Sequence, residues 1–337
     1  MSSDAQSSSA RPTTLSPTLR TGIFPASGGL GGSTLAHLLS SVDPHTVTLI
    51  ARQPEKLAKQ AEQGATVRKA DYDDESSLQH VFDGIDVLFL ISYPSIQHEH
   101  RFKVAKAAID EAIKAGVRHI FYSSLAFAGD GNPTSVTQVM AAHLSTEQYL
   151  AQVQQKNPTT FSYTAVREGL YSESYPIYTA FFDINNPPAS GEIRIPHNGS
   201  GPGISWAKRD NLGEATARLI VRYIEDPASF PWLNKIIVLS GPRAYTLSET
   251  ADVFSHILGK PIKIVETSVD DYVQQPQVKL GFDYGTGDWA RLWANSFEGI
   301  RQSETNVVNS HLRDLLGREP EDFETTIRNS LAATKEQ

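Results

Sequence analysis

A glycine cluster near the N-terminus most constrains what this chain can fold into. Residues 21–24 have the composition of a short β-strand, the turn PASGGLGGST occupies residues 25–34, and residues 35–39 have the composition of a helix. A strand, a glycine-rich turn and a helix in this order form the dinucleotide-binding turn of a Rossmann fold. The glycines let the backbone approach a pyrophosphate, and the helix N-terminus offers free N–H groups. We therefore predict phosphate contacts from Ser27, Gly28, Gly29, Leu30 and Gly31.

Pro25 departs from the usual spacing, G-x-x-G-x-x-G, at the place of the first glycine. Proline fixes φ near −65° and has no N–H group, so a phosphate contact from this position is lost. Many tight turns are glycine-rich without binding anything, and this remains the alternative interpretation. A second apolar strand at residues 47–51, ending before Arg52, favours the dinucleotide interpretation.

Strand-like and helix-like patterns alternate through the first half of the chain. The later strands are expected at residues 47–51, 65–69, 86–91, 117–123 and 161–166. Helices are expected at residues 54–63, 74–82, 97–115 and 139–155. Repeated β-α units with crossover helices imply an α/β fold with a Rossmann-type, doubly wound parallel sheet.

The second half is less regular. Residues 171–209 are rich in proline and glycine; after them a helix is expected at 210–224, strands at 236–239 and 261–265, and helices from 288 onward. Thr246 and Glu249 have the spacing of a capping box before a helix that ends at 258. We expect a disordered tail at 1–20, an NAD(P)-binding Rossmann domain at 21–170, and a smaller C-terminal α+β substrate lobe at 171–337, interleaved with the Rossmann core.

Composition excludes several classes of function. The net charge of −8 argues against a nucleic-acid partner. The absence of cysteine excludes disulfides, thiolate metal sites and cysteine nucleophiles, and it fits the cytoplasm. No run approaches the roughly 18 apolar residues of a membrane span. His98 and His100 are spaced poorly for a shared metal, and beyond the glycine turn there is no flavin signature, so we expect neither metal nor flavin.

Several further motifs follow in a fixed order along the chain. They are RQPEK at 52–56, DYDDESSL at 71–78, AGVRHI at 115–120, HLSTE at 143–147, REGLYSE at 167–173 and LSGP at 239–242. Together with the glycine turn they resemble the NmrA-like family of atypical short-chain dehydrogenases/reductases, which includes quinone oxidoreductases and isoflavone-reductase-like enzymes. The resemblance implies NAD(P) binding and an oxidoreductase; it does not specify a substrate.

Arg52 stands where the adenosine ribose of a bound dinucleotide would lie. A guanidinium can hold the 2′-phosphate of NADP(H) bidentately, and Lys56 follows about one helical turn later. We therefore expect NADP(H) to be preferred over NAD(H). Two solvated surface charges are the alternative interpretation.

Other cofactor contacts are expected at the ends of later strands. The resemblance places Asp71 beside the adenine, with Tyr72 next to it, although Asp71 is also a candidate helix N-cap. Ser92 and Tyr93 are expected near the phosphates or the nicotinamide ribose. Ser123 and Glu168 are expected near the nicotinamide.

The chain has no Tyr-x-x-x-Lys pair, so the usual alcohol chemistry of short-chain dehydrogenases is not expected. The resemblance places His143 where relatives carry a catalytic or cofactor-contacting lysine, and Glu147, four residues later, falls on the same helical face. We expect His143 to donate a proton, and Tyr171 to pack on the nicotinamide or bind substrate. A packing histidine bonded to Glu147 and an aromatic plug are the respective alternatives.

Two functions therefore remain open. The first is an NADPH-dependent reductase of a carbonyl, quinone, enone or imine in a flat, apolar small molecule, as in specialised metabolism. The second is a non-catalytic NADP(H) sensor that binds a protein partner. A sugar-nucleotide epimerase is disfavoured because those enzymes also use the Tyr-Lys pair. The sequence does not indicate an oligomeric state.

Overall fold

The computed structural model describes residues 19–284 and 287–335. Its centre is a seven-stranded sheet in the order β3-β2-β1-β4-β5-β6-β8, in which every pair of neighbours is parallel. The strands are β1 (Thr21–Phe24), β2 (Val47–Ala51), β3 (Thr66–Lys69), β4 (Val87–Ile91), β5 (His119–Leu125), β6 (Ser162–Glu168) and β8 (Lys235–Leu239). The predicted doubly wound parallel sheet is confirmed.

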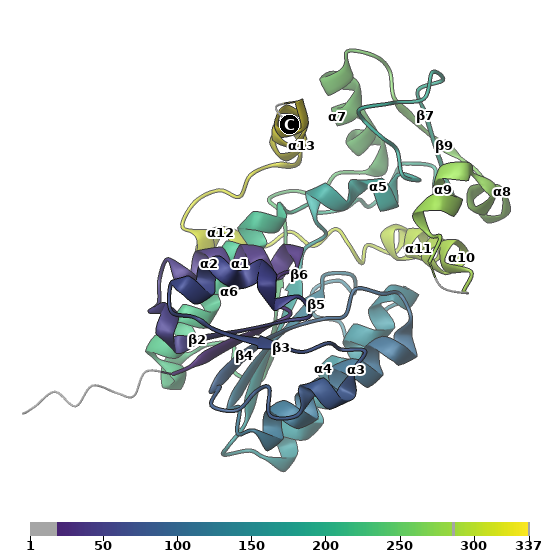
Figure 1. Cartoon of the computed structure of the whole chain (residues 1–337). Helices are drawn as coiled ribbons and strands as arrows, with labels where there is room; N and C mark the ends of the chain where they lie inside the picture. Colours follow the sequence, from purple (N-terminus) through teal and green to yellow (C-terminus); the bar gives the residue numbers. More distant parts are fainter. Residues whose placement is uncertain (1–18, 285–286, 336–337) are drawn as a thin grey trace, which may run out of the picture.

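Helices cover both faces of this sheet (Figure 1). One face carries α1 (Gly29–Leu39), α6 (Arg209–Glu225) and α12 (His311–Leu316), whose apolar side chains form one core cluster with the sheet. The other face carries α3 (His98–Lys114) and α4 (Gln138–Lys156), which contribute to a second cluster. The apolar run of β4 is buried because both faces of the strand are covered. The short helix α2 (Ala58–Glu62) follows β2.

A second lobe is built largely from residues after β6, and it lies beyond the sheet (Figure 1). Its two parallel strands are β7 (Glu192–Ile195) and β9 (Lys263–Glu266). Its helices are α5 (Tyr175–Tyr178), α7 (Leu247–Leu258), α8 (Val269–Gln274), α9 (Pro276–Gly281), α10 (Trp289–Ala294), α11 (Ser296–Arg301) and α13 (Phe323–Lys335). The capping box of Thr246 and Glu249 at the start of α7 is confirmed.

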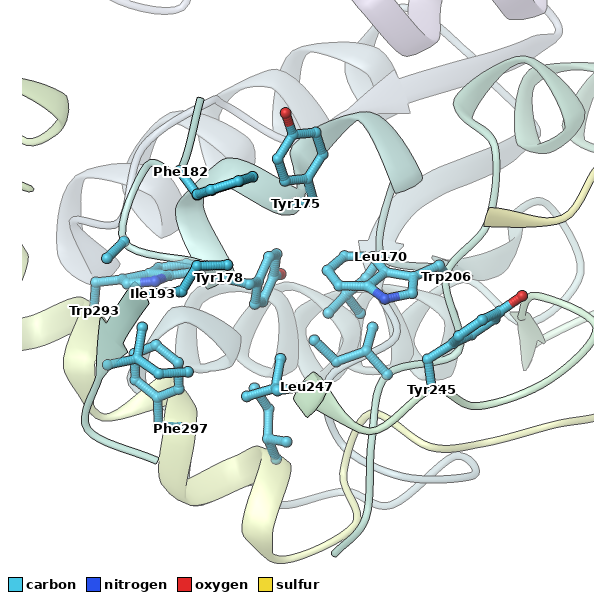
Figure 2. Close-up of a cluster of buried hydrophobic side chains, with 14 of the residues drawn as sticks. Leu170, Tyr175, Tyr178, Phe182, Ile193, Trp206, Tyr245, Leu247, Trp293 and Phe297 are labelled. Carbon is cyan, nitrogen blue, oxygen red and sulfur yellow. The ribbon is translucent and has the colours of Figure 1, made fainter. Parts of the chain in front are cut away.

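The core of the lobe is aromatic (Figure 2). Tyr178 lies between two indole rings, with centroid distances of 5.2 Å to both Trp206 and Trp293. Trp206 is fully buried, and its indole N–H donates to Thr250. The same cluster includes Phe127 from the segment after β5, so it also packs the lobe against the sheet domain.

Two expectations about local structure need correction. The helix expected at 74–82 is only a 3-10 turn, Glu75–Leu78, because the chain becomes extended at Gln79 and His80 then has a left-handed φ of 60°. Strand β7 lies within the segment expected to be irregular. The tail expected at 1–20 falls outside the described residues except for its last two, and there the Arg20 N–H donates to the Asp86 carboxylate. Among the described helices, none combines the length and apolar character needed to cross a bilayer.

Candidate active site

The glycine turn joins β1 to α1 and opens the N-terminus of that helix. Gly28 is the N-cap, in an extended conformation and with no side-chain cap. The Gly32 N–H donates to the Gly28 carbonyl, so the earlier N–H groups of the first turn have no helical acceptor. A Cβ on Gly31 would collide with the Pro25 carbonyl, whereas one on Gly28 would meet nothing within 4 Å. The turn therefore packs tightly on one side and leaves its backbone open on the other.

A cleft of about 540 Å³ lies at the carboxyl ends of β1, β4, β5 and β6. The glycine turn forms one end, and the second lobe contributes Ile177, Tyr178 and Trp293. Most of the predicted site residues line it: Gly28, Gly29, Leu30, Gly31, Ser92, Tyr93, Ser123, His143, Glu168 and Tyr171. The five that do not line it are Ser27, Arg52, Lys56, Asp71 and Tyr72.

Arg52 and Lys56 are exposed just beyond the end of β2. Among the ion pairs of the described residues, none involves either side chain. Both cations are thus available to an anionic ligand at this edge of the sheet, and their role in holding a 2′-phosphate stays a prediction.

Tyr72 packs in the core and does not face the cleft. Its ring lies 4.4 Å from that of Phe24, and its hydroxyl donates to the Ile91 carbonyl at 2.6 Å. This side chain therefore has a packing role, and the cofactor contact expected at Tyr72 stays a prediction. The Asp71 carboxylate accepts the Asp73 N–H, and it is Asp74, not Asp71, that caps the following turn.

Glu168 is buried at the end of β6, and one of its carboxylate oxygens has no hydrogen-bond partner among the residues that the structure describes. The other oxygen accepts from the Thr216 hydroxyl at 2.8 Å. Burial raises the pKa of Glu168 to about 8, so the side chain is mostly protonated at neutral pH. Tyr171 lies beside it in the wall of the cleft, and burial raises the pKa of its phenol as well.

Glu147 does not bond to His143, contrary to the expectation from their helical spacing. It pairs instead with the buried Arg167, through Nη2–Oε2 at 2.7 Å and Nε–Oε1 at 3.0 Å, and also accepts from the Ser124 hydroxyl. The HLSTE and REGLYSE motifs therefore meet in a buried ion pair that joins α4 to the end of β6.

His143 is bonded to other partners. Its Nε2 lies 2.6 Å from Nη2 of Arg101, and its Nδ1 lies 3.2 Å from the Tyr122 hydroxyl. A guanidinium only donates, so Nε2 accepts and Nδ1 carries the hydrogen. Burial, together with the charges of Arg101 and Arg167, holds the pKa of His143 well below its usual value. The imidazole is neutral at physiological pH, and its one hydrogen points at Tyr122, so the expected role as proton donor is not supported by this geometry.

Among the cleft residues that were not predicted from the sequence, two carry a positive charge, Arg101 and Arg209. Arg101 shares a helix face with Val104, Ala105 and Ala108, and a cation on an apolar face was the available signal. Arg209 begins α6, where the Glu173 carboxylate accepts its backbone N–H. No local pattern marked it, because only the tertiary fold brings α6 to the glycine turn.

The Arg209 guanidinium lies against the glycine turn. A Cβ built on Gly29 would lie 3.0 Å from its Nη1, and its guanidinium carbon is 6.0 Å from the centre of the Tyr171 ring. The residues present therefore fit a dinucleotide: open backbone N–H groups, a cation beside them, and the free Arg52 at the neighbouring strand end.

Comparison with known proteins gives a consistent result. The model of the NmrA-like family matches residues 19–283. Quinone oxidoreductase 2 of Escherichia coli is 31% identical over 253 residues, covering 73% of this chain and 77% of that protein. An NmrA-like family domain-containing oxidoreductase of Aspergillus flavus is 24% identical over 322 residues, covering 92% and 94%. The crystal structure of an NADPH-dependent quinone oxidoreductase of Escherichia coli with NADPH matches with a TM-score of 0.74 at 26% identity, over 92% of this chain and 99% of that one.

Proposed function

The chain belongs to the NmrA-like family, and from this premise we propose that it is an NADPH-dependent oxidoreductase that reduces the conjugated carbonyl of an apolar small molecule. Quinones and enones are the acceptors we favour, in molecules of the kind made in specialised metabolism. The observation that carries this proposal is that one continuous cleft is lined both by the glycine turn and by residues of the aromatic lobe.

The glycine turn would hold the pyrophosphate of NADPH, with Arg209 as the nearest cation. Arg52 and Lys56 would hold the 2′-phosphate. When bound, NADPH supplies a hydride for transfer to the acceptor. Ser123, Glu168 and Tyr171, at the ends of β5 and β6, would then surround the nicotinamide end of the cleft.

The far end of the cleft suits a flat acceptor. Tyr178 and Trp293 are inclined at 69° to one another, and Leu170 and Ile177 add aliphatic surface. Such walls exclude water and stack on planar rings, which holds donor and acceptor in a reactive arrangement. An apolar cleft of this kind accounts for substrate orientation without a dedicated proton donor.

The test is NADPH oxidation, followed by absorbance, with a panel of benzoquinones, naphthoquinones, cyclic enones and cyclic imines. Binding of NADPH and NADH is measured in parallel by titration calorimetry. We expect turnover with quinones or enones, and tighter binding of NADPH than of NADH. Lys156→Asp serves as a control for surface charge, because Lys156 is exposed at the end of α4 and does not line the cleft. This substitution should leave both measurements unchanged.

Two results would contradict the proposal in different ways. If the protein binds neither NADPH nor NADH, the proposed cofactor is wrong. Tight NADPH binding without turnover on any acceptor would support a non-catalytic sensor instead.

A further inference from the structure

The cleft contains a buried cation that no carboxylate of the described residues pairs with. Arg101 is 5% exposed and lines the cleft from the first turn of α3. Within residues 19–284 and 287–335, no ion pair includes it. A buried guanidinium is normally matched by a carboxylate, because an unpaired charge is costly to remove from water.

The hydrogen bonds of Arg101 leave part of its guanidinium unused. Nη1 donates to the Val139 carbonyl at 3.0 Å, and Nη2 donates to the Ser92 hydroxyl at 2.9 Å and to His143. These contacts use three of its five N–H groups. The Nε–H is buried without a partner, and the second hydrogen on Nη1 also has none in the part of the chain that the structure describes.

The groups around Arg101 do not neutralise it. His143 on α4 is neutral, and Tyr122 on β5 keeps its hydroxyl hydrogen because burial raises its pKa. The charge of Glu147 is matched by Arg167. Glu168, across the cleft at the end of β6, is mostly protonated near neutral pH. The polar wall of the cleft is therefore positive.

We propose that Arg101, held in place by Ser92 and His143, stabilises the negative charge that develops on the acceptor oxygen during reduction. This inference rests on the proposed function and narrows its substrate class. It assigns the site to neutral acceptors that become oxyanions, such as quinones and enones. Cationic acceptors, such as iminium ions and triphenylmethane dyes, would be repelled by the same charge.

The step balances without a further reactant. A neutral quinone accepts a hydride, which carries two electrons and one proton, and NADPH leaves as NADP⁺. The new bond on the acceptor shifts an electron pair onto its carbonyl oxygen, which becomes the oxyanion beside Arg101. That oxygen then takes a proton from water after the product leaves the cleft. Preorganised donors of this kind contribute strongly because the site excludes water.

The first experiment measures kcat and KM for menadione in Arg101→Gln, Arg101→Lys and wild type. We expect Arg101→Gln to lower kcat/KM by about 10²–10³-fold, mostly through kcat, because a contact of the transition state is lost. Arg101→Lys keeps the charge and should recover about tenfold of that loss. Lys103→Gln, two residues along α3 and exposed, is the matched control and should behave as wild type.

A cationic triphenylmethane dye supplies the opposite probe, since its reduction yields a neutral product. Its rate relative to menadione should rise in Arg101→Gln. An equal loss with both acceptors would show a structural role only and would overturn the proposal.

The second experiment needs no turnover. The protein saturated with NADP⁺ is titrated with 4-nitrophenol, and the phenolate is followed by its visible absorption. Wild type should increase the acid dissociation constant of the bound phenol about tenfold or more over free nitrophenol, and Arg101→Gln should abolish this increase. The proposal would be refuted if bound nitrophenol had the same acid dissociation constant in Arg101→Gln as in wild type, provided that the variant keeps the wild-type melting temperature and NADPH affinity.

NADPH affinity separates this proposal from the proposed function. We expect Arg101→Gln to change it by less than about threefold, well under 1.4 kcal/mol. A tenfold or larger loss would reassign Arg101 to the cofactor and overturn the substrate role. Absence of NADPH binding in wild type would instead refute the proposed function itself.

Discussion

Arg52 is the residue on which cofactor preference depends. It is exposed at the end of β2 and has no carboxylate partner among the described residues, so a 2′-phosphate would gain a new charge-assisted contact. We expect Arg52→Asp to weaken NADPH binding by roughly 1–3 kcal/mol and to leave NADH binding nearly unchanged, as measured by titration calorimetry. Equal weakening of both dinucleotides would show that Arg52 does not hold the 2′-phosphate.

Glu168 gives the protein a predictable pH dependence. Burial raises its pKa from 4.5 to about 8, so the folded state binds more protons than the unfolded state between these values. This contribution to stability is present below pH 4.5 and is lost as the pH rises through 8. Glu168→Gln keeps an acceptor for Thr216 and does not titrate. As the pH is raised from 5 to 8, the free energy of unfolding of this variant should rise relative to that of wild type by roughly 2–4 kcal/mol.

Urea unfolding at several pH values measures this difference. Glu225→Gln, on an exposed glutamate at the end of α6, is the matched control and should show a difference that does not change with pH. If the difference in free energy of unfolding between Glu168→Gln and wild type also does not change with pH, the carboxyl group is ionised in the folded protein.

Single residues also show where sequence reasoning ended. Residues at strand ends, such as Ser92, Ser123 and Glu168, could be assigned to the cleft because parallel strands end at one edge of the sheet. The partner of His143 could not be predicted. Helical spacing pointed to Glu147, but Arg167 on β6 and Arg101 on α3 decide both pairings through tertiary contacts.

At the scale of elements, the turn between β1 and α1 allows a matched pair of substitutions. A Cβ on Gly31 would collide with the Pro25 carbonyl, whereas a Cβ on Gly32 would meet nothing within 4 Å. Gly31→Ala should therefore displace the turn, weaken NADPH binding at least tenfold and lower the melting temperature. Gly32→Ala should bind normally and be as stable as wild type or up to about 1 kcal/mol more stable, because alanine favours a helix. Similar binding by both variants would contradict a close approach of the turn to the cofactor.

Element prediction succeeded where the pattern was long and failed where it was short. The apolar run of β4 and the amphipathic α3 lie within one residue of their expected bounds at 86–91 and 97–115. The segment 74–82 has acidic residues suited to a helix start, yet Asp74 caps only one turn, which ends where Gln79 is extended and His80 is left-handed. A backbone conformation at a single residue is set by packing, and composition does not reveal it.

For the whole molecule, ligand binding should appear as stability. NADPH at 100 times its dissociation constant should raise the free energy of unfolding by about 2.7 kcal/mol, because only the folded chain assembles the cleft. Thermal or urea unfolding with and without NADPH measures this effect, and Gly31→Ala at the same concentration serves as a control with a smaller gain. No change in wild type would mean that the cofactor does not bind the native state.

The architecture as a whole was more predictable than the site. Alternating β-α patterns indicated the parallel sheet, and the loosened pattern after residue 171 indicated the second lobe. The cleft could not be predicted from either half of the sequence alone. Arg209 and Trp293 come from the second half of the chain, whereas the glycine turn comes from the first. Contacts so distant in sequence leave no local signal.

Tyr178 and Trp293 serve the cleft wall and the aromatic core of the lobe at once. A smaller side chain at either position would enlarge the room for bulkier acceptors but would also leave a void in the packing of this aromatic core. Substitutions that broaden the range of acceptors would therefore lower the thermal stability of the protein. Compensating substitutions in the core would be needed first. Ser174 lines the cleft without belonging to that aromatic core, so substitutions there would be less constrained.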